Sequence, residues 1–182
     1  MATGLKRKLE YDDYQRLPDD GKRYEILDGE LYVMLTAPSP LHQRVSKRLQ
    51  RKLEDYFEAR GLGEVFNAPI DMILGPHDVA QPDILVVTNP AQISGRGIEG
   101  APLLAVEVLS PSTRRHDREV KMRRYAALAI RHYWIVDPGG KWIACYQLAG
   151  DTYQHVLTSE GDTQIVPADW PELTIALADL WR

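Results

Sequence analysis

The sequence predicts an α/β protein in which a mixed sheet lies between two layers of helices. The elements follow the order helix, three strands, helix, strand, with additional β strands at both ends of the chain. Two of the central strands are nearly continuous apolar runs, which is typical of strands covered on both faces. These observations together predict a three-layer core. The length of 182 residues fits a single domain spanning residues 1–182.

The N-terminal part begins with a predicted arm at residues 1–22, which includes the basic patch Lys6-Arg7-Lys8. Two short strands are predicted at residues 24–35, around the pair Asp28-Gly29. An Asp-Gly pair between apolar residues is the strongest sequence signal for a two-residue turn. We therefore expect a β hairpin before the first helix.

A first helix is predicted after Ser39, whose side chain can cap it, with Pro40 in its first turn. Gly61 stands where a C-terminal cap belongs. The helix has an apolar stripe at helical spacing, formed by Leu41, Val45, Leu49, Leu53 and Phe57. Its other faces carry five cations, Arg44, Lys47, Arg48, Arg51 and Lys52.

The remaining elements are bounded by Gly, Pro and Asn residues. Three strands are predicted at residues 65–74, 82–87 and 102–109, followed by a helix at 117–130 and a buried strand at 132–137. A C-terminal β extension is predicted at residues 141–182. It comprises a hairpin of strands at 141–148 and 152–158 and a last strand at 173–181.

The composition limits the classes of function. With 44% apolar and 26% charged residues, the sequence is typical of a globular protein. Cys145 is the only cysteine, which excludes a disulfide framework within the chain and a thiolate zinc cluster. No apolar run approaches the roughly 18 residues of a membrane span, and the polar start lacks a signal-peptide core. We therefore expect a cytoplasmic protein without membrane contact. The net charge of -4 argues against a generally basic coat, although not against a local basic patch.

Two familiar ligand patterns do not indicate a site in this sequence. The five histidines show no HExxH or similar metal-ligand spacing. Gly95, Gly97 and Gly100 fit a GxGxxG pattern, but Ala101-Pro102 and a strand follow it instead of a helix. The pattern therefore does not indicate a dinucleotide site.

Two carboxylates break the apolar pattern of the central strands. Glu107 lies inside its strand, where a buried charge is unfavourable unless it is paired or binds a metal. The alternative is a structural salt bridge with Arg114 or Arg115. Asp83 is a similar exception at the entrance of the preceding strand, where the alternative is a turn residue.

If the two strands are neighbours in the sheet, Asp83 and Glu107 can approach one cation from the same face. One or two carboxylates, together with water and substrate phosphate, are typical ligands of magnesium. Such an ion lowers the pKa of bound water and neutralises charge on a phosphate under attack. The pair therefore predicts a Mg²⁺ or Mn²⁺ site.

A cationic stretch follows Glu107. It contains seven basic residues, Arg114, Arg115, Arg118, Lys121, Arg123, Arg124 and Arg131. A solvated helix face is the usual meaning of such a run. Here it begins just beyond the predicted metal site, where a phosphate backbone would lie, so Arg114, Arg115 and Arg118 are candidate contacts to nucleic acid.

Several motifs resemble those of the Uma family of candidate bacterial endonucleases, formerly known only as a domain of unknown function. The motifs are YEILDGEL, SPLHQRVSKRL, PDILVV, VEVLSPST, HYWIVDP and the spacing Asp117-x-x-x-Lys121-x-x-x-Tyr125. The resemblance covers about residues 20 to 140. The family is grouped with the PD-(D/E)XK, restriction-endonuclease-like superfamily. The resemblance therefore implies an αβββαβ nuclease core and phosphodiester hydrolysis assisted by magnesium or manganese.

Individual residues can be matched to the motifs of this family. Asp83 matches the aspartate of the PD element, and Glu107 matches the acidic residue of (D/E)XK. The lysine of (D/E)XK would fall at position 109, where this chain has Leu109. In the family this role is assigned to a lysine on the following helix, which matches Lys121, and a long lysine stem can reach back toward the strand. The alternative is a surface cation in a basic helix.

Three further polar residues are weaker candidates. Glu25 matches the acidic residue of the YE motif and could complete the metal site or orient water; the alternative is a surface charge paired with Arg23. His42, in the first helical turn, could contact phosphate or water, or simply occupy the capping turn. Asp71 could be a further ligand, although an outward-facing strand residue is the alternative.

These features predict a metal-dependent endonuclease that acts on double-stranded DNA, with Lys121 stabilising charge on the phosphorus. The alternatives are a catalytically silent nuclease-like module that binds DNA or a protein, and an unrelated hydrolase on the same core. The apolar strands at 142–148 and 173–181 could cover the sheet edge or form a homodimer. A two-fold symmetric dimer suits an enzyme that cuts two antiparallel strands.

Overall fold

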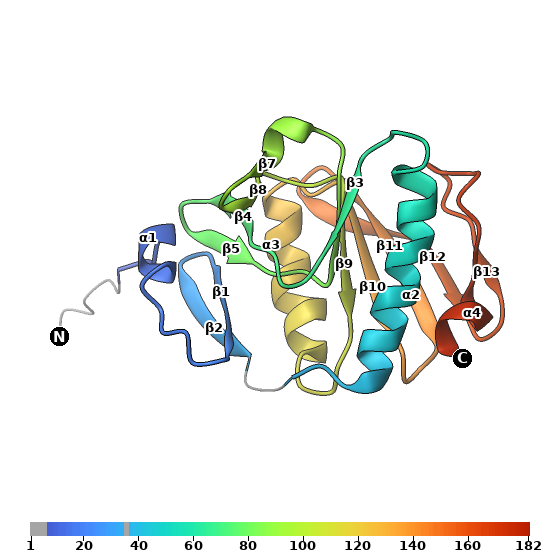
Figure 1. Cartoon of the computed structure of the whole chain (residues 1–182), viewed down its shortest axis with the longest axis horizontal. Helices are drawn as coiled ribbons and strands as arrows, with labels where there is room; N and C mark the ends of the chain where they lie inside the picture. Colours follow the sequence, from blue (N-terminus) through green and yellow to red (C-terminus); the bar gives the residue numbers. More distant parts are fainter. Residues whose placement is uncertain (1–6, 35–36) are drawn as a thin grey trace.

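The computed structural model describes residues 7–34 and 37–182 of the chain (Figure 1). The predicted order of helix, three strands, helix and strand is confirmed as α2, β3, β6, β9, η2–α3 and β10. The elements are α1 (Tyr11–Tyr14), β1 (Arg23–Leu27), β2 (Glu30–Met34), α2 (Pro40–Phe57), β3 (Glu64–Asn67), β4 (Met72–Gly75), β5 (Asp78–Ala80), β6 (Ile84–Val87), η1 (Pro90–Gln92), β7 (Ile93–Ser94), β8 (Gly97–Glu99), β9 (Leu104–Val108), the π-helical η2 (His116–Lys121), α3 (Met122–Ala127), β10 (His132–Asp137), β11 (Trp142–Ala149), β12 (Thr152–Glu160), β13 (Gln164–Ile165), β14 (Ile175–Ala176) and α4 (Leu177–Trp181).

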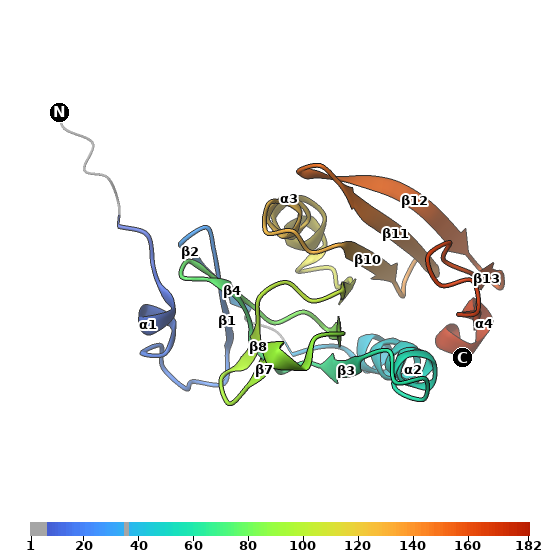
Figure 2. The same cartoon turned by 90° about the horizontal axis from the view of Figure 1, so that it is seen from above.

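The central sheet has the strand order β12-β11-β10-β9-β6-β3. It is mixed, as predicted, because β9 and β10 run parallel while the other neighbours are antiparallel. Successive side chains of a strand point to opposite faces. Val106 accordingly packs with α2 on one face, and Ala105 packs with α3 on the other. The two helices therefore cover opposite faces of the sheet (Figure 2).

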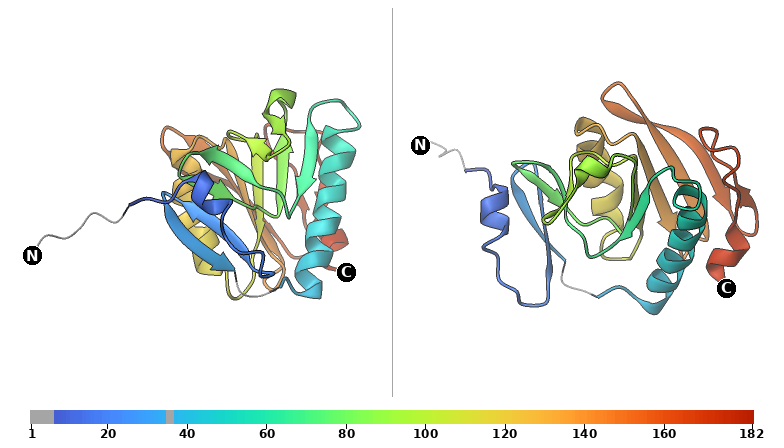
Figure 3. Two further views of the ribbon diagram at one scale, coloured as in Figure 1. Left: turned by 60° about the vertical axis from the view of Figure 1, so that its left-hand side comes forward. Right: turned by 45° about the horizontal axis from the view of Figure 1, so that its top comes forward.

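A second sheet, in the order β2-β1-β5-β4-β8-β7, packs on the α3 face of the central sheet. It lies at the N-terminal end of the molecule, opposite the C-terminal segment that accompanies α2 (Figure 3). The predicted hairpin in this sheet is confirmed, since Leu27 pairs with Glu30 around Asp28 and Gly29. Both turn residues have positive φ angles, 53° and 77°, as a two-residue hairpin turn of this kind requires.

Helix α2 begins and ends at the residues that the sequence predicts. The Ser39 side chain accepts a hydrogen bond from the His42 backbone N–H at 3.2 Å. Gly61 has a φ of 66°, and the Leu62 N–H donates to the Phe57 carbonyl, which is a glycine-based C-terminal cap. The predicted apolar stripe is buried except at Leu41, which is 39% exposed.

Two predicted strands are wrong in part. The stretch 65–74 is divided between the sheets, with β3 in the central sheet and β4 in the second. Pro69 lies between them, and proline cannot donate the N–H that a continuous ladder needs. The predicted last strand at 173–181 is only β14, followed by helix α4, whose Leu177 and Leu180 are buried in the core beside α2.

The predicted second helix is present but irregular. It comprises the π-helical η2 and the α-helical α3, and the hairpin of β11 and β12 follows β10 as predicted. Residues of the predicted arm lie against the second sheet: the Leu9 N–H donates to Gly29 and the Tyr11 N–H to Pro76. Lys6 lies outside the described residues. None of the helices in the described ranges combines the length and the apolar character needed to cross a membrane.

Candidate active site

Two neighbouring strands bring Asp83 and Glu107 together. Ile84 of β6 is opposite Val106 of β9, so extending this antiparallel register by one residue places Asp83 opposite Glu107. Both carboxylates are buried, with 8% and 4% exposure, and both line a pocket of about 300 Å³. Asp83 Oδ2 accepts a hydrogen bond from the Val108 N–H at 2.8 Å. The expectation that the two strands are neighbours is confirmed, and a simple turn role does not account for the burial of Asp83.

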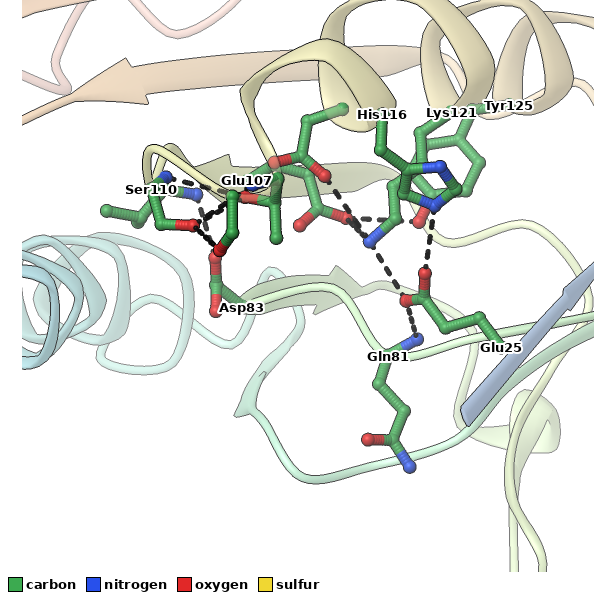
Figure 4. Close-up of polar contacts among 12 residues, drawn as sticks. Glu25, Gln81, Asp83, Glu107, Ser110, His116, Lys121 and Tyr125 are labelled. Carbon is green, nitrogen blue, oxygen red and sulfur yellow. Dashed lines mark hydrogen bonds and ion pairs between the residues drawn. The ribbon is translucent and has the colours of Figure 1, made fainter. Parts of the chain in front are cut away.

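The helix that follows β9 carries a lysine into the same pocket. Lys121 Nζ lies 2.9 Å from Glu107 Oε1 and 3.7 Å from Asp117 Oδ1. The side chain is almost fully buried, so the surface-cation alternative is wrong. Tyr125, one turn further along, donates its hydroxyl to Glu107 Oε1 at 3.1 Å. Figure 4 shows the Lys121 amine between Glu107 and Glu25.

The second sheet contributes Glu25 from β1. Its Oε1 lies 2.9 Å from Lys121 Nζ and accepts the Gln81 N–H at 2.9 Å, and its Oε2 lies 3.3 Å from His116 Nε2. Glu25 is 2% exposed. The alternative of a surface charge paired with Arg23 is therefore wrong. Glu25 and Glu107 hold the lysine from two different sheets.

The salt bridges proposed as alternatives for Glu107 do not form. Arg114 pairs with Asp137 at 2.8 Å, and Arg115 pairs with Glu119 at 3.0 Å. The buried partner of Glu107 is the helix lysine, not an arginine of the loop.

Burial and charge set the protonation of the carboxylates. Burial raises the pKa of Glu107 well above its ordinary value, and the nearby Asp117 and Asp83 add to this effect, although Lys121 opposes it. Burial likewise raises the pKa of Asp117. Burial would also raise the pKa of Glu25, but Lys121, His116 and the Gln81 N–H lower it to about 2. Glu25 is thus the carboxylate that carries the counter-charge of the lysine.

Lys121 remains an ammonium at neutral pH. Burial alone would lower its pKa, but Glu107, Glu25 and Asp117 together hold the pKa well above its ordinary value. A permanently charged amine cannot act as a general base at neutral pH. It can stabilise negative charge on a substrate.

Helix α2 places His42 beside Asp83. His42 Nε2 lies 3.2 Å from Asp83 Oδ2, and both residues line the pocket. His42 Nδ1 is buried and has no hydrogen-bond partner among the described residues. A capping-turn role alone leaves this contact unexplained. Asp71 is elsewhere: its carboxylate accepts hydrogen bonds from Tyr14 and Gln81, and it does not line the pocket.

The three arginines predicted to contact nucleic acid do not line the pocket. Arg114 and Arg115 are engaged in the ion pairs described above, and the Arg118 guanidinium lies 5.8 Å from the centre of the Trp142 ring. The adjoining loop enters the pocket instead through Ser110, Ser112 and Thr113.

Two features of the site escaped the sequence analysis. His116 and Gln81 contact Glu25, and neither residue lies in a periodic pattern that marks it. The π-helical geometry of η2 also has no sequence signal, although π-helical turns often occur at functional sites. The four-residue spacing of Asp117, Lys121 and Tyr125 predicts that they lie on one face of the helix. All three side chains are buried.

The model of the Uma2 family, described as "Putative restriction endonuclease", matches residues 11–178. This match spans most of the chain. The chain belongs to the Uma2 family. The predicted family is therefore confirmed.

One sequence relative and one solved structure are similar to this chain. An uncharacterised protein of Synechocystis sp. is 31% identical over 119 residues, which are 65% of this chain and 59% of that protein. The matched region thus spans less than two thirds of the relative. A crystal structure described as "a putative nuclease belonging to DUF820", from Anabaena variabilis, has a TM-score of 0.76 at 18% identity and covers 95% of this chain and 97% of that chain. This likeness confirms the predicted restriction-endonuclease-like fold.

The buried carboxylates of the Uma2 site are oxygen donors of the type that a divalent cation takes. Four buried carboxylates line the pocket, Glu25, Asp83, Glu107 and Asp117, and three of them, Glu25, Glu107 and Asp117, lie within 4 Å of the Lys121 ammonium. In the described ranges, no three His, Cys, Asp or Glu side chains are arranged to hold a metal by themselves. Magnesium commonly takes one or two carboxylates and completes its shell with water and phosphate. Asp83 and Glu107, opposed across two strands, are the two that would hold it.

The charge of Glu25 gives a test of the buried ion pair between Glu25 and Lys121. The pKa of Glu25 is about 2, below its ordinary value of 4.5, so its ionisation stabilises the fold above pH 4.5 and this contribution is lost as the pH falls toward 2. Glu25→Gln should lower the free energy of unfolding at pH 7 by up to roughly 3 kcal/mol, and the loss should shrink steadily below pH 4.5. Urea titrations at several pH values measure this.

The matched control is Glu64→Gln, because Glu64 is an exposed strand residue without an ion pair among those described. It should change stability by less than about 0.5 kcal/mol at every pH. If the loss of unfolding free energy in Glu25→Gln does not vary with pH, the ionised carboxylate of Glu25 is not what stabilises the fold at this ion pair.

Proposed function

We propose that this Uma2 protein is a metal-dependent endonuclease that hydrolyses phosphodiester bonds in double-stranded DNA. The observation that carries the proposal is the meeting of Asp83, Glu107 and the Lys121 ammonium in one pocket. Paired carboxylates suit a divalent ion, and a fixed positive charge beside them suits an anionic transition state. Membership of the Uma2 family, described as "Putative restriction endonuclease", supports nucleic acid as the substrate.

Each group has its own role in this proposal. When bound at Asp83 and Glu107, magnesium or manganese would neutralise phosphate charge and lower the pKa of a bound water. Lys121 stabilises the negative charge that develops on the phosphate oxygens. Glu25 holds the Lys121 amine in position before the substrate binds, so the positive charge does not have to be oriented during the reaction. His42 orients the Asp83 carboxylate from helix α2.

The test is cleavage of supercoiled plasmid DNA by the purified chain. With Mg²⁺ or Mn²⁺ we expect nicked and then linear product, and a chelator should stop the reaction. A parallel preparation of Asp83→Asn controls for contaminating nucleases, because the contaminant would be common to both preparations.

The outcomes separate the candidate functions. DNA binding without cleavage under any metal would contradict the proposed hydrolysis and favour the silent nuclease-like module. Neither binding nor cleavage would contradict the nucleic-acid substrate altogether.

A further inference from the structure

Three adjoining hollows lead away from the carboxylates along helix α2. The pocket at Asp83 shares Arg23, His42 and Asp83 with a second hollow of about 240 Å³. The second shares Gln43 and Ser46 with a third hollow of about 310 Å³. Because neighbouring hollows share lining residues, the three hollows lie side by side in a row that starts at the active site, and we call this row the groove.

The far part of this groove is basic. Lys47 and Arg51 line the third hollow, and Arg44 lies one turn before Lys47 on the same exposed stripe of α2. Within the described ranges, these three side chains have no ion pair or hydrogen bond, whereas Glu54 in the same hollow accepts a hydrogen bond from Gln50. Like charges at this helical spacing destabilise a helix. The stripe therefore has no evident structural purpose.

The other cations of α2 do have structural partners. Arg48 donates to the Leu180 carbonyl at 3.1 Å, and Lys52 lies 3.3 Å from Asp179. Both fix the C-terminal helix α4 to α2. The division between engaged and unengaged cations follows the two faces of the helix, and the unengaged face is the one that borders the groove.

The polarity of α2 agrees with an anionic occupant. The helix starts at the active site, with His42 in its first turn, and that turn contains no acidic residue. The N-terminal end of a helix carries a partial positive charge that attracts anions such as phosphate. The helix therefore presents its positive N-terminal end at the active site and the cations Lys47 and Arg51 further along, where Glu54 is the one carboxylate of the third hollow.

From these observations we propose that the phosphate backbone of the substrate strand leaves the active site along α2 and is held there by Lys47 and Arg51. This inference rests on the proposed nuclease function. Lys47 and Arg51 are four residues apart, about 6 Å along the helix axis. A DNA strand carries one charge per roughly 3.4 Å of duplex axis, so the two cations reach different phosphates of one strand.

The test compares two double variants that remove the same amount of charge. Lys47→Gln/Arg51→Gln changes the α2 stripe, and Arg115→Gln/Arg118→Gln changes the cationic segment after β9. Affinity for a short DNA duplex is measured in chelator, between about 50 and 200 mM salt. Removing two phosphate contacts should reduce the slope of log K against log salt by about 1.8, and only the α2 variant should show this reduction.

Each outcome has a definite meaning. If the α2 variant keeps the wild-type slope, or if the Arg115/Arg118 variant shows the loss instead, the α2 path is wrong while the nuclease function stands. If the wild-type chain neither binds nor cleaves nucleic acid, the proposed function fails and this inference fails with it. Thermal melting of both variants close to the wild type excludes a folding defect as the cause.

Discussion

Replacing Asp83 with asparagine should reduce metal-supported DNA cleavage by at least about a thousandfold, since a metal ion supplies several kcal/mol of transition-state stabilisation. The substitution is nearly isosteric, and an asparagine oxygen can still accept the hydrogen bond from the Val108 N–H. The fold should therefore persist. The initial rate of plasmid nicking in excess Mg²⁺ measures the loss.

The same variant should lose the stabilisation that metal binding confers. A ligand that binds only the folded state at a hundred times its dissociation constant adds about 2.7 kcal/mol to stability. Wild-type melting temperature should rise with Mn²⁺ or Mg²⁺, and that of Asp83→Asn should not. Asp55→Asn is the matched control, because Asp55 is an exposed residue near the C-terminal end of α2 and does not line the pocket at Asp83. Full cleavage by Asp83→Asn would remove this carboxylate from the proposed metal site.

The parts of the fold that follow local rules could be predicted from the sequence. The ends of α2 follow from Ser39 and Gly61, and the first hairpin follows from Asp28-Gly29. Asp83 and Glu107 also stand out as candidate site residues, because both interrupt strands that otherwise have apolar side chains on both faces, although their pairing was predicted only on the condition that the two strands are neighbours. In each case the signal lies within a few residues of the feature that it predicts.

Features that depend on distant parts of the chain could not be predicted. The burial of Glu25 results from the second sheet packing against η2, where Lys121 and His116 lie about 90 residues later in the sequence. Helix α4 forms because Leu177 and Leu180 find an apolar surface beside α2, although the same residues read equally well as a strand. Short apolar runs are ambiguous between helix and strand until their neighbours are known.

The structure gives a physical reason why Leu109 can replace the expected lysine. Leu109 lies on the same face of its strand as Glu107, but it is buried in the core between the sheet and α3. An ammonium there would need its own counter-charge. On the helix, Lys121 has counter-charges in Glu25 of the second sheet and Glu107 of β9, each 2.9 Å from its amine.

This arrangement predicts that Lys121→Ala loses cleavage while metal binding survives. The carboxylates hold the ion, whereas the ammonium acts mainly on charge that develops in the transition state. Removing one partner of a buried ion pair can cost about 3–5 kcal/mol, so Lys121→Gln is the safer companion variant, since its amide can still donate to Glu25. Cleavage rates and Mn²⁺-induced shifts in melting temperature should be measured on both variants.

Restoring the amine to the strand tests whether the lost function is the charge itself. Leu109→Lys in the Lys121→Ala background should recover part of the cleavage, because position 109 is on the same strand face as Glu107 and the Lys121→Ala change leaves Glu25 and Glu107 without their cation. Recovery should be incomplete, since a preorganised charge loses much of its effect when it is misplaced by a small distance. Leu109→Lys alone should help little, because two ammonium groups would compete for one site. Wild-type cleavage rates for Lys121→Ala and Lys121→Gln would contradict this role and leave Lys121 as a structural counter-ion of Glu25 and Glu107.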